Sequence, residues 1–253
     1  MQQDTKGLSM NPHETKFGFQ TIKESEKVER VGKVFNSVSS NYDLMNNLMS
    51  LGLHNVWKKI LIDTSSLKPK AKILDIAAGT ADLTLAFAKA NKSYEILQTD
   101  INHSMLMEGQ KKLINNGEII PAITCDAEAL PFPNNYFDCV TIAFGLRNMT
   151  KKEVALREVY RVLSPGGKVL ILEFSHIYQP LQKIYDTLSF KIIPMLGKFF
   201  AKDELSYKYL VESIRVHPTQ EELKTMMEAE AFEKVSYRNL SAGIVAIHKG
   251  YKF

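Results

Sequence analysis

Three acidic residues stand where predicted buried strands end, and carboxylates at such positions can accept hydrogen bonds from a ligand's hydroxyl groups. Asp75 lies at the end of KILDI (72–76), Asp100 ends the next apolar run 25 residues later, and Asp126 follows AITC (122–125). The carboxyl ends of parallel strands meet at one edge of a sheet. An acid at about this spacing commonly binds ribose hydroxyls. Each acid alone could equally be a turn residue or a helix cap, but together they favour a ligand with a ribose and cationic character.

The turn after the first strand is built of small residues that would let a ligand approach the backbone closely. Residues 77–81 read AAGTA, and DLTLAFAK then repeats its apolar residues at helical spacing. A dinucleotide would require G-x-G-x-x-G to cradle its pyrophosphate, and here only Gly79 is a glycine. S-adenosylmethionine has no phosphate and carries a cationic sulfonium, an amino group and a ribose diol. The residues therefore predict this cofactor, held by Asp75, Gly79 and Asp100, and argue against a nicotinamide-dependent dehydrogenase.

Strand-like and helical stretches alternate from Lys72 to Phe174, and this alternation is typical of parallel strands joined by helices. The last residues, KVSYRNLSAGIVAIHKG, predict two further strands with a turn near Ala242 and Gly243. We therefore expect an α/β protein with a doubly wound, mostly parallel seven-stranded sheet. N-terminal helices and a helical insertion before the last helix complete the expected fold.

The chain divides into two predicted parts. Residues 1–65 form an N-terminal tail and lid helices, with the first 22 residues polar and loose, and residues 66–253 form the cofactor-binding core. An aromatic-rich insertion covers 177–217, and Thr219 followed by Glu222 predicts a capping box at the start of the next helix.

Composition describes an ordinary globular chain of 253 residues, 45% hydrophobic, with a formal net charge of +4. Its lysines and arginines are scattered, so nucleic-acid binding is not expected. Cys125 and Cys139 fall in or beside predicted buried strands and are interpreted as core residues instead of a disulfide or metal site. The N-terminus lacks the apolar core of a signal peptide, and no apolar run reaches about 18 residues. We expect a cytoplasmic protein, with attachment to a membrane surface left open.

Several stretches resemble the family of S-adenosylmethionine-dependent C-methyltransferases that complete the quinol rings of menaquinone and ubiquinone. The SPGG turn and the first strand turn are shared with many methyltransferases, whereas other elements are much more specific to this family. The matching stretches include ILDIAAGTADLT, TDINHSMLMEGQKKL, FGLRNM, YRVLSPGGKVLILEFS, ESIRVHPTQEELKTMM and HKGYKF. The resemblance runs through nearly the whole chain and implies a class I methyltransferase fold.

By this resemblance, the cofactor contacts fall on residues of the predicted strand ends: Thr80, Asp100, Asp126, Ala127 and Ala143. The family usually has AGGTGD where this chain has AAGTAD, and a serine is common where Ala143 stands. A positive φ at Ala78 or Ala81 would be disfavoured. Gly79 survives, so we expect cofactor binding to be retained.

Methylation of a quinol ring requires an electron-rich ring carbon, which forms when a neighbouring hydroxyl loses its proton. Arg147, expected to face the cleft, is the candidate that stabilises the phenolate, because a guanidinium stays charged and cannot be an ordinary base. Asn148 could hold a second ring oxygen. Tyr42, Asp43, His54 and His217 are candidates for the proton acceptor, as is bulk water.

The polyprenyl tail of such a quinol requires an apolar path. Residues 177–200 mix apolar side chains with lysines that can snorkel toward lipid headgroups, which favours a tail-binding lid that dips into a membrane. An amphipathic helix packed on the sheet or on a partner subunit explains the pattern equally well. That partner could be a second copy of the chain or another member of a quinone-biosynthesis assembly. Two other functions stay open: methylation of another small aromatic acceptor, and a noncatalytic scaffold that binds cofactor or lipid.

Overall fold

A computed structural model describes residues 13–38, 50, 52–182 and 204–253 of the chain. Its centre is a seven-stranded sheet with the order β5-β4-β3-β6-β7-β9-β8. β3, β4, β5, β6 and β7 pair in parallel, and β9 runs antiparallel to both of its neighbours. The strands are β3 (Lys72–Ile76), β4 (Glu95–Asp100), β5 (Ala122–Thr124), β6 (Phe137–Ala143), β7 (Leu163–Phe174), β8 (Glu233–Leu240) and β9 (Val245–Tyr251). The predicted doubly wound sheet is confirmed.

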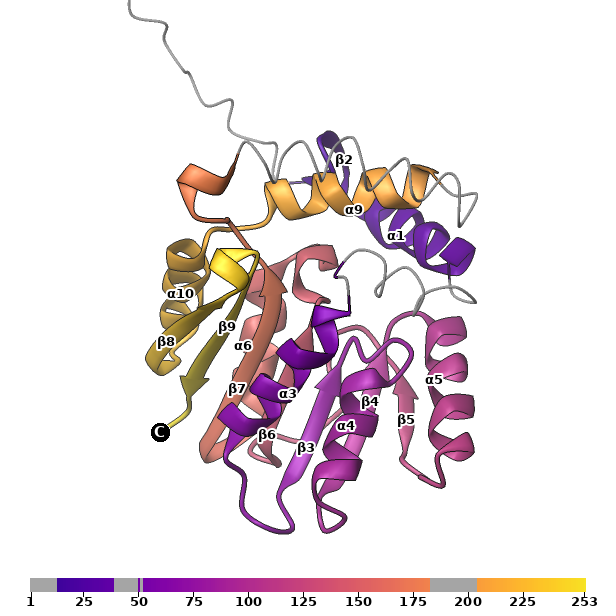
Figure 1. Cartoon of the computed structure of the whole chain (residues 1–253), viewed down its shortest axis with the longest axis vertical. Helices are drawn as coiled ribbons and strands as arrows, with labels where there is room; N and C mark the ends of the chain where they lie inside the picture. Colours follow the sequence, from indigo (N-terminus) through magenta and orange to yellow (C-terminus); the bar gives the residue numbers. More distant parts are fainter. Residues whose placement is uncertain (1–12, 39–49, 51, 183–203) are drawn as a thin grey trace, which may run out of the picture.

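Helices cover both faces of this sheet because its strands are apolar on both sides (Figure 1). One face packs against α3 (Leu53–Ser65), α4 (Asp82–Ala90) and α5 (His103–Asn115), where Trp57, Phe87 and Leu113 are buried. The other face packs against α6 (Lys152–Val162) and α10 (Gln220–Ala229), where Leu156 and Met227 are buried. The predicted capping box is present, since Thr219 and Glu222 each bond the other's backbone N–H.

A third group of elements lies over the carboxyl ends of the strands: β1 (Glu14–Phe17), β2 (Gln20–Lys23), α1 (Glu24–Val38) and α9 (Glu204–Val216) (Figure 1). The expectation that the first 22 residues are loose is wrong for residues 14–22. β1 and β2 form an antiparallel hairpin, and the ring of Phe17 stacks on that of Tyr209 with 4.4 Å between centroids. The Glu212 carboxylate of α9 also accepts the Phe19 N–H at 3.2 Å. These partners are distant in sequence, so local pattern alone could not reveal them.

The turn between β3 and α4 has left-handed backbone at three positions. Ala77, Gly79 and Ala81 have φ of 53°, 54° and 62°. Two of these are alanines, for which this region is unfavourable. Hydrogen bonds hold the turn in place: the Ala78 N–H donates to Thr99 O at 3.0 Å and the Ala81 N–H to Ala78 O at 2.9 Å. The fully buried Ala81 therefore adopts the positive φ that its side chain disfavours.

The turn fits closely against α5 at Gly109. A Cβ added to Gly109 would lie 2.8 Å from Gly79 O and 3.0 Å from the Ala81 methyl. A side chain at Gly109 would therefore push the turn away from α5.

Gly109→Ala should lower the free energy of unfolding by about 1–3 kcal/mol, as overpacking commonly does. Gly32→Ala on α1 is the matched control, because apart from the adjoining backbone of α1 no heavy atom of the described residues lies within 4 Å of a Cβ placed there. That control should raise stability by about 0.5–1 kcal/mol, since alanine is the better helix former. Urea unfolding of both variants is the measurement. Equal effects would show that the turn does not press on Gly109.

Candidate active site

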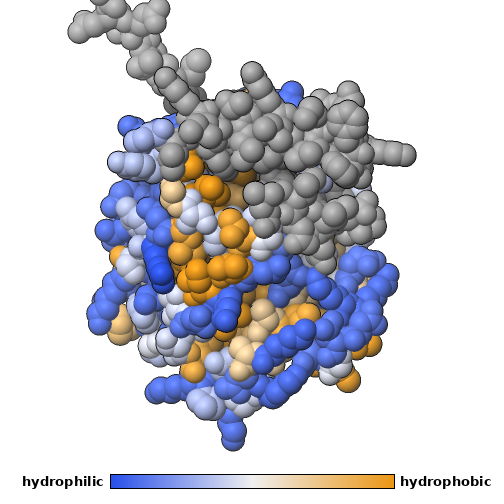
Figure 2. All heavy atoms as spheres, viewed as in Figure 1, coloured by the Kyte–Doolittle hydropathy of each residue, from blue (hydrophilic) through white to orange (hydrophobic). Residues whose placement is uncertain are grey.

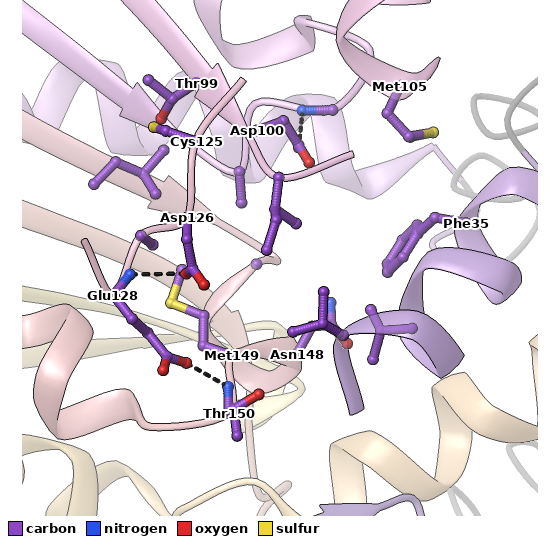
Figure 3. A pocket seen from close by; sticks show the side chains of 18 of the residues that line it. Phe35, Thr99, Asp100, Met105, Cys125, Asp126, Glu128, Asn148, Met149 and Thr150 are labelled. Atoms are coloured by element: carbon purple, nitrogen blue, oxygen red, sulfur yellow. Dashed lines mark hydrogen bonds between the residues drawn. The ribbon is translucent and has the colours of Figure 1, made fainter. Parts of the chain in front are cut away.

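A cavity of about 100 Å³ opens to solvent at the carboxyl ends of β3, β4, β5 and β6, beneath α1 (Figure 3). It lies beside the point where strand order reverses between β3 and β6, which is where open α/β sheets bind ligands. Residues of five segments line it: Val28, Val31, Phe35, Ile76, Ala77, Gly79, Thr99, Asp100, Ile101, Met105, Cys125, Asp126, Ala127, Glu128, Phe144, Gly145, Asn148, Met149 and Thr150.

Asp100 joins two loops at the edge of this cavity. One carboxylate oxygen accepts the Gly79 N–H at 2.9 Å and the other accepts the Asn102 N–H at 2.8 Å. Burial raises the pKa of this carboxyl, and the backbone donors oppose that shift. A carboxylate has about four lone-pair sites, so Asp100 can accept a ligand hydroxyl while it fixes the turn.

Asp126, Ala127 and two neighbours form another wall. One Asp126 oxygen accepts the Glu128 N–H at 2.9 Å, and Glu128 in turn accepts the N–H of Thr150 at 2.8 Å (Figure 3). Cys125, interpreted from sequence as a core residue, is half-buried and lines the cavity. Glu128 was missed as a site residue, although its place at the end of the third strand offered a signal.

Asp75, Thr80 and Ala143 line a smaller hollow that shares Ala77, Gly79 and Phe144 with the main cavity. The Asp75 carboxylate is buried and accepts the hydroxyls of Thr84 at 2.6 Å and Thr141 at 2.8 Å. Burial raises its pKa to about 6. Asp75 thus bonds to the sheet and to α4, and its carboxylate does not line the main cavity.

The Arg147 guanidinium lies in the interior instead of facing the cavity. Its Nη1 donates to Glu173 Oε1 at 2.8 Å and to the Phe144 carbonyl, and the two charged side chains are 4% and 2% exposed. The Arg147 N–H also donates to Glu173 Oε2 at 3.2 Å. The Glu173 carboxylate therefore neutralises the positive charge of Arg147, which we expected from the sequence to stabilise a phenolate. This pairing anchors the 3-10 turn η2 (Leu146–Asn148), whose last residue lines the cavity.

The predicted proton acceptors lie in different places. His217 is buried just after α9, and burial, followed by the nearby charge of Lys152, lowers its pKa well below 6.5. His54 is also buried, with Nδ1 2.8 Å from Ser50 Oγ. Neither histidine belongs to the lining of the cavity as described. Tyr42 and Asp43 lie outside the described residues, so their roles stay predictions.

α1 closes the cavity with apolar side chains, among them Val31 and Phe35. It is tied down by Lys27, whose Nζ donates to Met149 O at 2.9 Å, and by Asn36, whose side chain accepts Asn102 Nδ2 at 2.8 Å. Burial lowers the Lys27 pKa to about 7. Sequence placed lid helices here but gave no sign of which side chains would meet the cavity.

The sheet and its cavity define a class I S-adenosylmethionine-dependent methyltransferase fold. Haemonchus contortus phosphoethanolamine N-methyltransferase 2, solved with phosphomonomethylethanolamine and S-adenosylhomocysteine, superposes with a TM-score of 0.57 at 13% identity, covering 77% of this chain and 52% of that one. A putative methyltransferase of Haloferax volcanii, solved with the Trm112 activator, superposes with a TM-score of 0.64 at 11% identity. The match covers 86% of this chain and 96% of that one.

The family follows from sequence comparison. The model of the ubiE/COQ5 methyltransferase family matches residues 21–252. The ubiquinone/menaquinone biosynthesis C-methyltransferase UbiE of Burkholderia mallei (strain SAVP1) is 58% identical over 240 residues, which are 94% of this chain and 99% of that protein. The protein of the same name from Burkholderia thailandensis gives the same figures. The chain belongs to the ubiE/COQ5 methyltransferase family.

Glu173→Gln should lower the free energy of unfolding by about 3–5 kcal/mol, because it leaves the Arg147 charge buried without its counter-charge. Glu230→Gln is the matched control, because it removes the negative charge that pairs with Arg157. The Arg157 side chain is 67% exposed, so water can solvate its charge instead. Urea unfolding would compare them. Similar losses in the two variants would show that the Arg147 pair is not the structural anchor described here.

Proposed function

We propose that this chain transfers the methyl group of S-adenosylmethionine to a ring carbon of a polyprenylated quinol in ubiquinone or menaquinone biosynthesis. The observation that carries this proposal is the 58% identity to a C-methyltransferase of that name over 94% of the chain. The strand-end cavity supplies a place for the reaction. Demethylmenaquinol and the methoxy-polyprenyl-benzoquinol are the two acceptors to consider.

The residues of the cavity fit this cofactor. A carboxylate at Asp100 suits ribose hydroxyls, and the turn provides no glycine-rich cradle for a pyrophosphate. A Cβ at Gly79 would meet only the end of Met105 among the described residues, at 3.5 Å, so the turn leaves room beside the cavity. We assign Asp100 to the ribose, and Asp126 with Ala127, which line the same cavity, to further contacts with the cofactor. Thr80, Asp75 and Ala143, in the adjoining hollow, shape the turn beside the cofactor.

When bound, the cofactor supplies an activated methyl group, so the protein has to align the acceptor carbon and exclude water. Alignment can lower a barrier by roughly 7–11 kcal/mol. Val31 and Phe35 of α1 form an apolar wall that keeps water away. Asn148 faces the same cavity and can bond a quinol oxygen. We assign Arg147 the task of holding η2, through Glu173, so that Asn148 stays in place. Tyr42, which lies outside the described residues, remains a candidate for the proton acceptor, whereas His217 could act only through a group that reaches the cavity, because it does not line it.

The polyprenyl tail would leave the cavity along apolar surface. Apolar side chains gather over the carboxyl end of β7 and the start of β9 (Figure 2). Nearby on α3, Leu53 is 41% and Val56 is 52% exposed. Of the segment 177–200, predicted from sequence to cover the tail, residues 183–200 lie outside the described residues.

Across residues 13–38, 52–182 and 204–253, no helix is both long and apolar enough to cross a membrane. A membrane-bound quinol would then be reached by peripheral contact at the cytoplasmic face. Assembly with a second copy or with other quinone-biosynthesis proteins remains part of the proposal.

The test of this function is transfer of a labelled methyl group to each of the two quinols, with and without a reductant. Label should enter the lipid extract only under reducing conditions, because the quinone form lacks the ionisable hydroxyl that activates the ring. Label in neither quinol, from protein that binds S-adenosylmethionine, would contradict the proposal.

Asp100→Ala should weaken S-adenosylmethionine binding by at least about tenfold, since a hydrogen bond to a charged group contributes about 1.5–3 kcal/mol. Isothermal titration calorimetry measures this directly. Asp138→Ala is the control, because Asp138 accepts the Lys72 N–H at 2.8 Å at the start of β3, away from the cavity. Unchanged affinity in Asp100→Ala would refute the assignment of Asp100 to the ribose.

A further inference from the structure

Tyr209 of α9 forms a hydrogen bond to a side chain of the cavity. Its hydroxyl donates to Asn148 Oδ1 at 3.0 Å. Tyr209 is 6% exposed, whereas Asn148 is half-buried and lines the cavity. The phenol therefore approaches Asn148 from the protein side, and the ligand would approach it from the cavity.

The tyrosine is itself held on its ring face. Phe17 of β1 stacks on it, with 4.4 Å between centroids and 22° between the ring planes. The hairpin that carries Phe17 is fastened to the same helix, because Glu212 of α9 accepts the Phe19 N–H. Two elements far apart in sequence thus fix one phenol, which lets it hold Asn148 in one orientation.

The bond decides which end of the Asn148 amide serves the cavity. An amide has one carbonyl acceptor and one NH₂ donor. The carbonyl oxygen already accepts the phenol proton, so the NH₂ group is the end available to a ligand oxygen. Burial raises the pKa of Tyr209 to about 12, so the phenol keeps its proton throughout the physiological pH range.

We propose that Tyr209 is a positioning residue that orients the Asn148 amide, so that its NH₂ group donates to the quinol oxygen on which negative charge develops. This inference rests on the proposed quinol methyltransferase function. A donor aimed at developing charge accelerates a reaction most when it is oriented beforehand. Without the phenol, the amide can rotate and present its carbonyl oxygen, which would repel that charge.

The test is a double-mutant cycle in the full-length protein with Tyr209→Phe, Asn148→Ala and the double variant, assayed by methyl transfer to the accepted quinol. Tyr209→Phe should lower kcat about tenfold, because a misoriented group loses most of its effect, and leave the KM for S-adenosylmethionine nearly unchanged. Asn148→Ala should lower kcat at least as much. The double variant should match Asn148→Ala, since the phenol acts only through that amide.

Tyr94→Phe is the matched control, because its hydroxyl lies near Leu67 O, 3.5 Å away, at the opposite end of the sheet. It should keep the wild-type kcat. Thermal unfolding of each variant separates a loss of fold from a loss of rate. An unchanged kcat in Tyr209→Phe, or losses that multiply in the double variant, would overturn the positioning role. A wild-type protein that methylates neither quinol would instead overturn the proposed function on which this role rests.

Discussion

The Asp100 carboxylate is the interaction on which the arrangement of the site depends. By accepting the N–H groups of Gly79 and Asn102, it ties the turn after β3 to the start of α5. The turn after β3 borders the point where strand order reverses, and residues of both loops line the cavity, so this bond helps to shape it. Gly109 allows α5 to approach the turn closely enough for the bond to form. The same carboxylate thus shapes the site and, in the proposed function, also binds ligand hydroxyls.

A second constraint fixes the side of the cavity where Asn148 lies, which is the side proposed to bind the acceptor. Glu173, near the end of β7, holds both the guanidinium and the backbone N–H of Arg147. Buried ion pairs add little stability relative to an apolar pair, but they define one geometry because breaking them is costly. Here the geometry concerns η2 and Asn148. Tyr209 of α9 donates a hydrogen bond to the same Asn148, and Phe17 of the N-terminal hairpin stacks on Tyr209. This side of the cavity therefore depends on residues from β7, η2 and α9.

Much of the fold could be predicted because its signals are local. The alternation of apolar runs with helical stretches predicted the sheet. The positions of Asp100 and Asp126 at strand ends predicted that they belong to the site, and both line the cavity. The interior position of Arg147 was not predictable, since its partner Glu173 lies 26 residues away and strand ends do not reveal which side chains turn inward. The hairpin was missed for a similar reason: its strands are short and polar, and they pack against α9, which is distant in sequence, as well as against α1.

The central claim is that one cavity holds the cofactor on Asp100 and presents the acceptor to Asn148. A crystal structure of the protein with S-adenosylhomocysteine tests it most directly. The account predicts that the ribose hydroxyls bond the Asp100 carboxylate and that the sulfur faces the part of the cavity lined by Asn148. A nucleoside bound away from Asp100, or a sulfur directed away from Asn148, would contradict it.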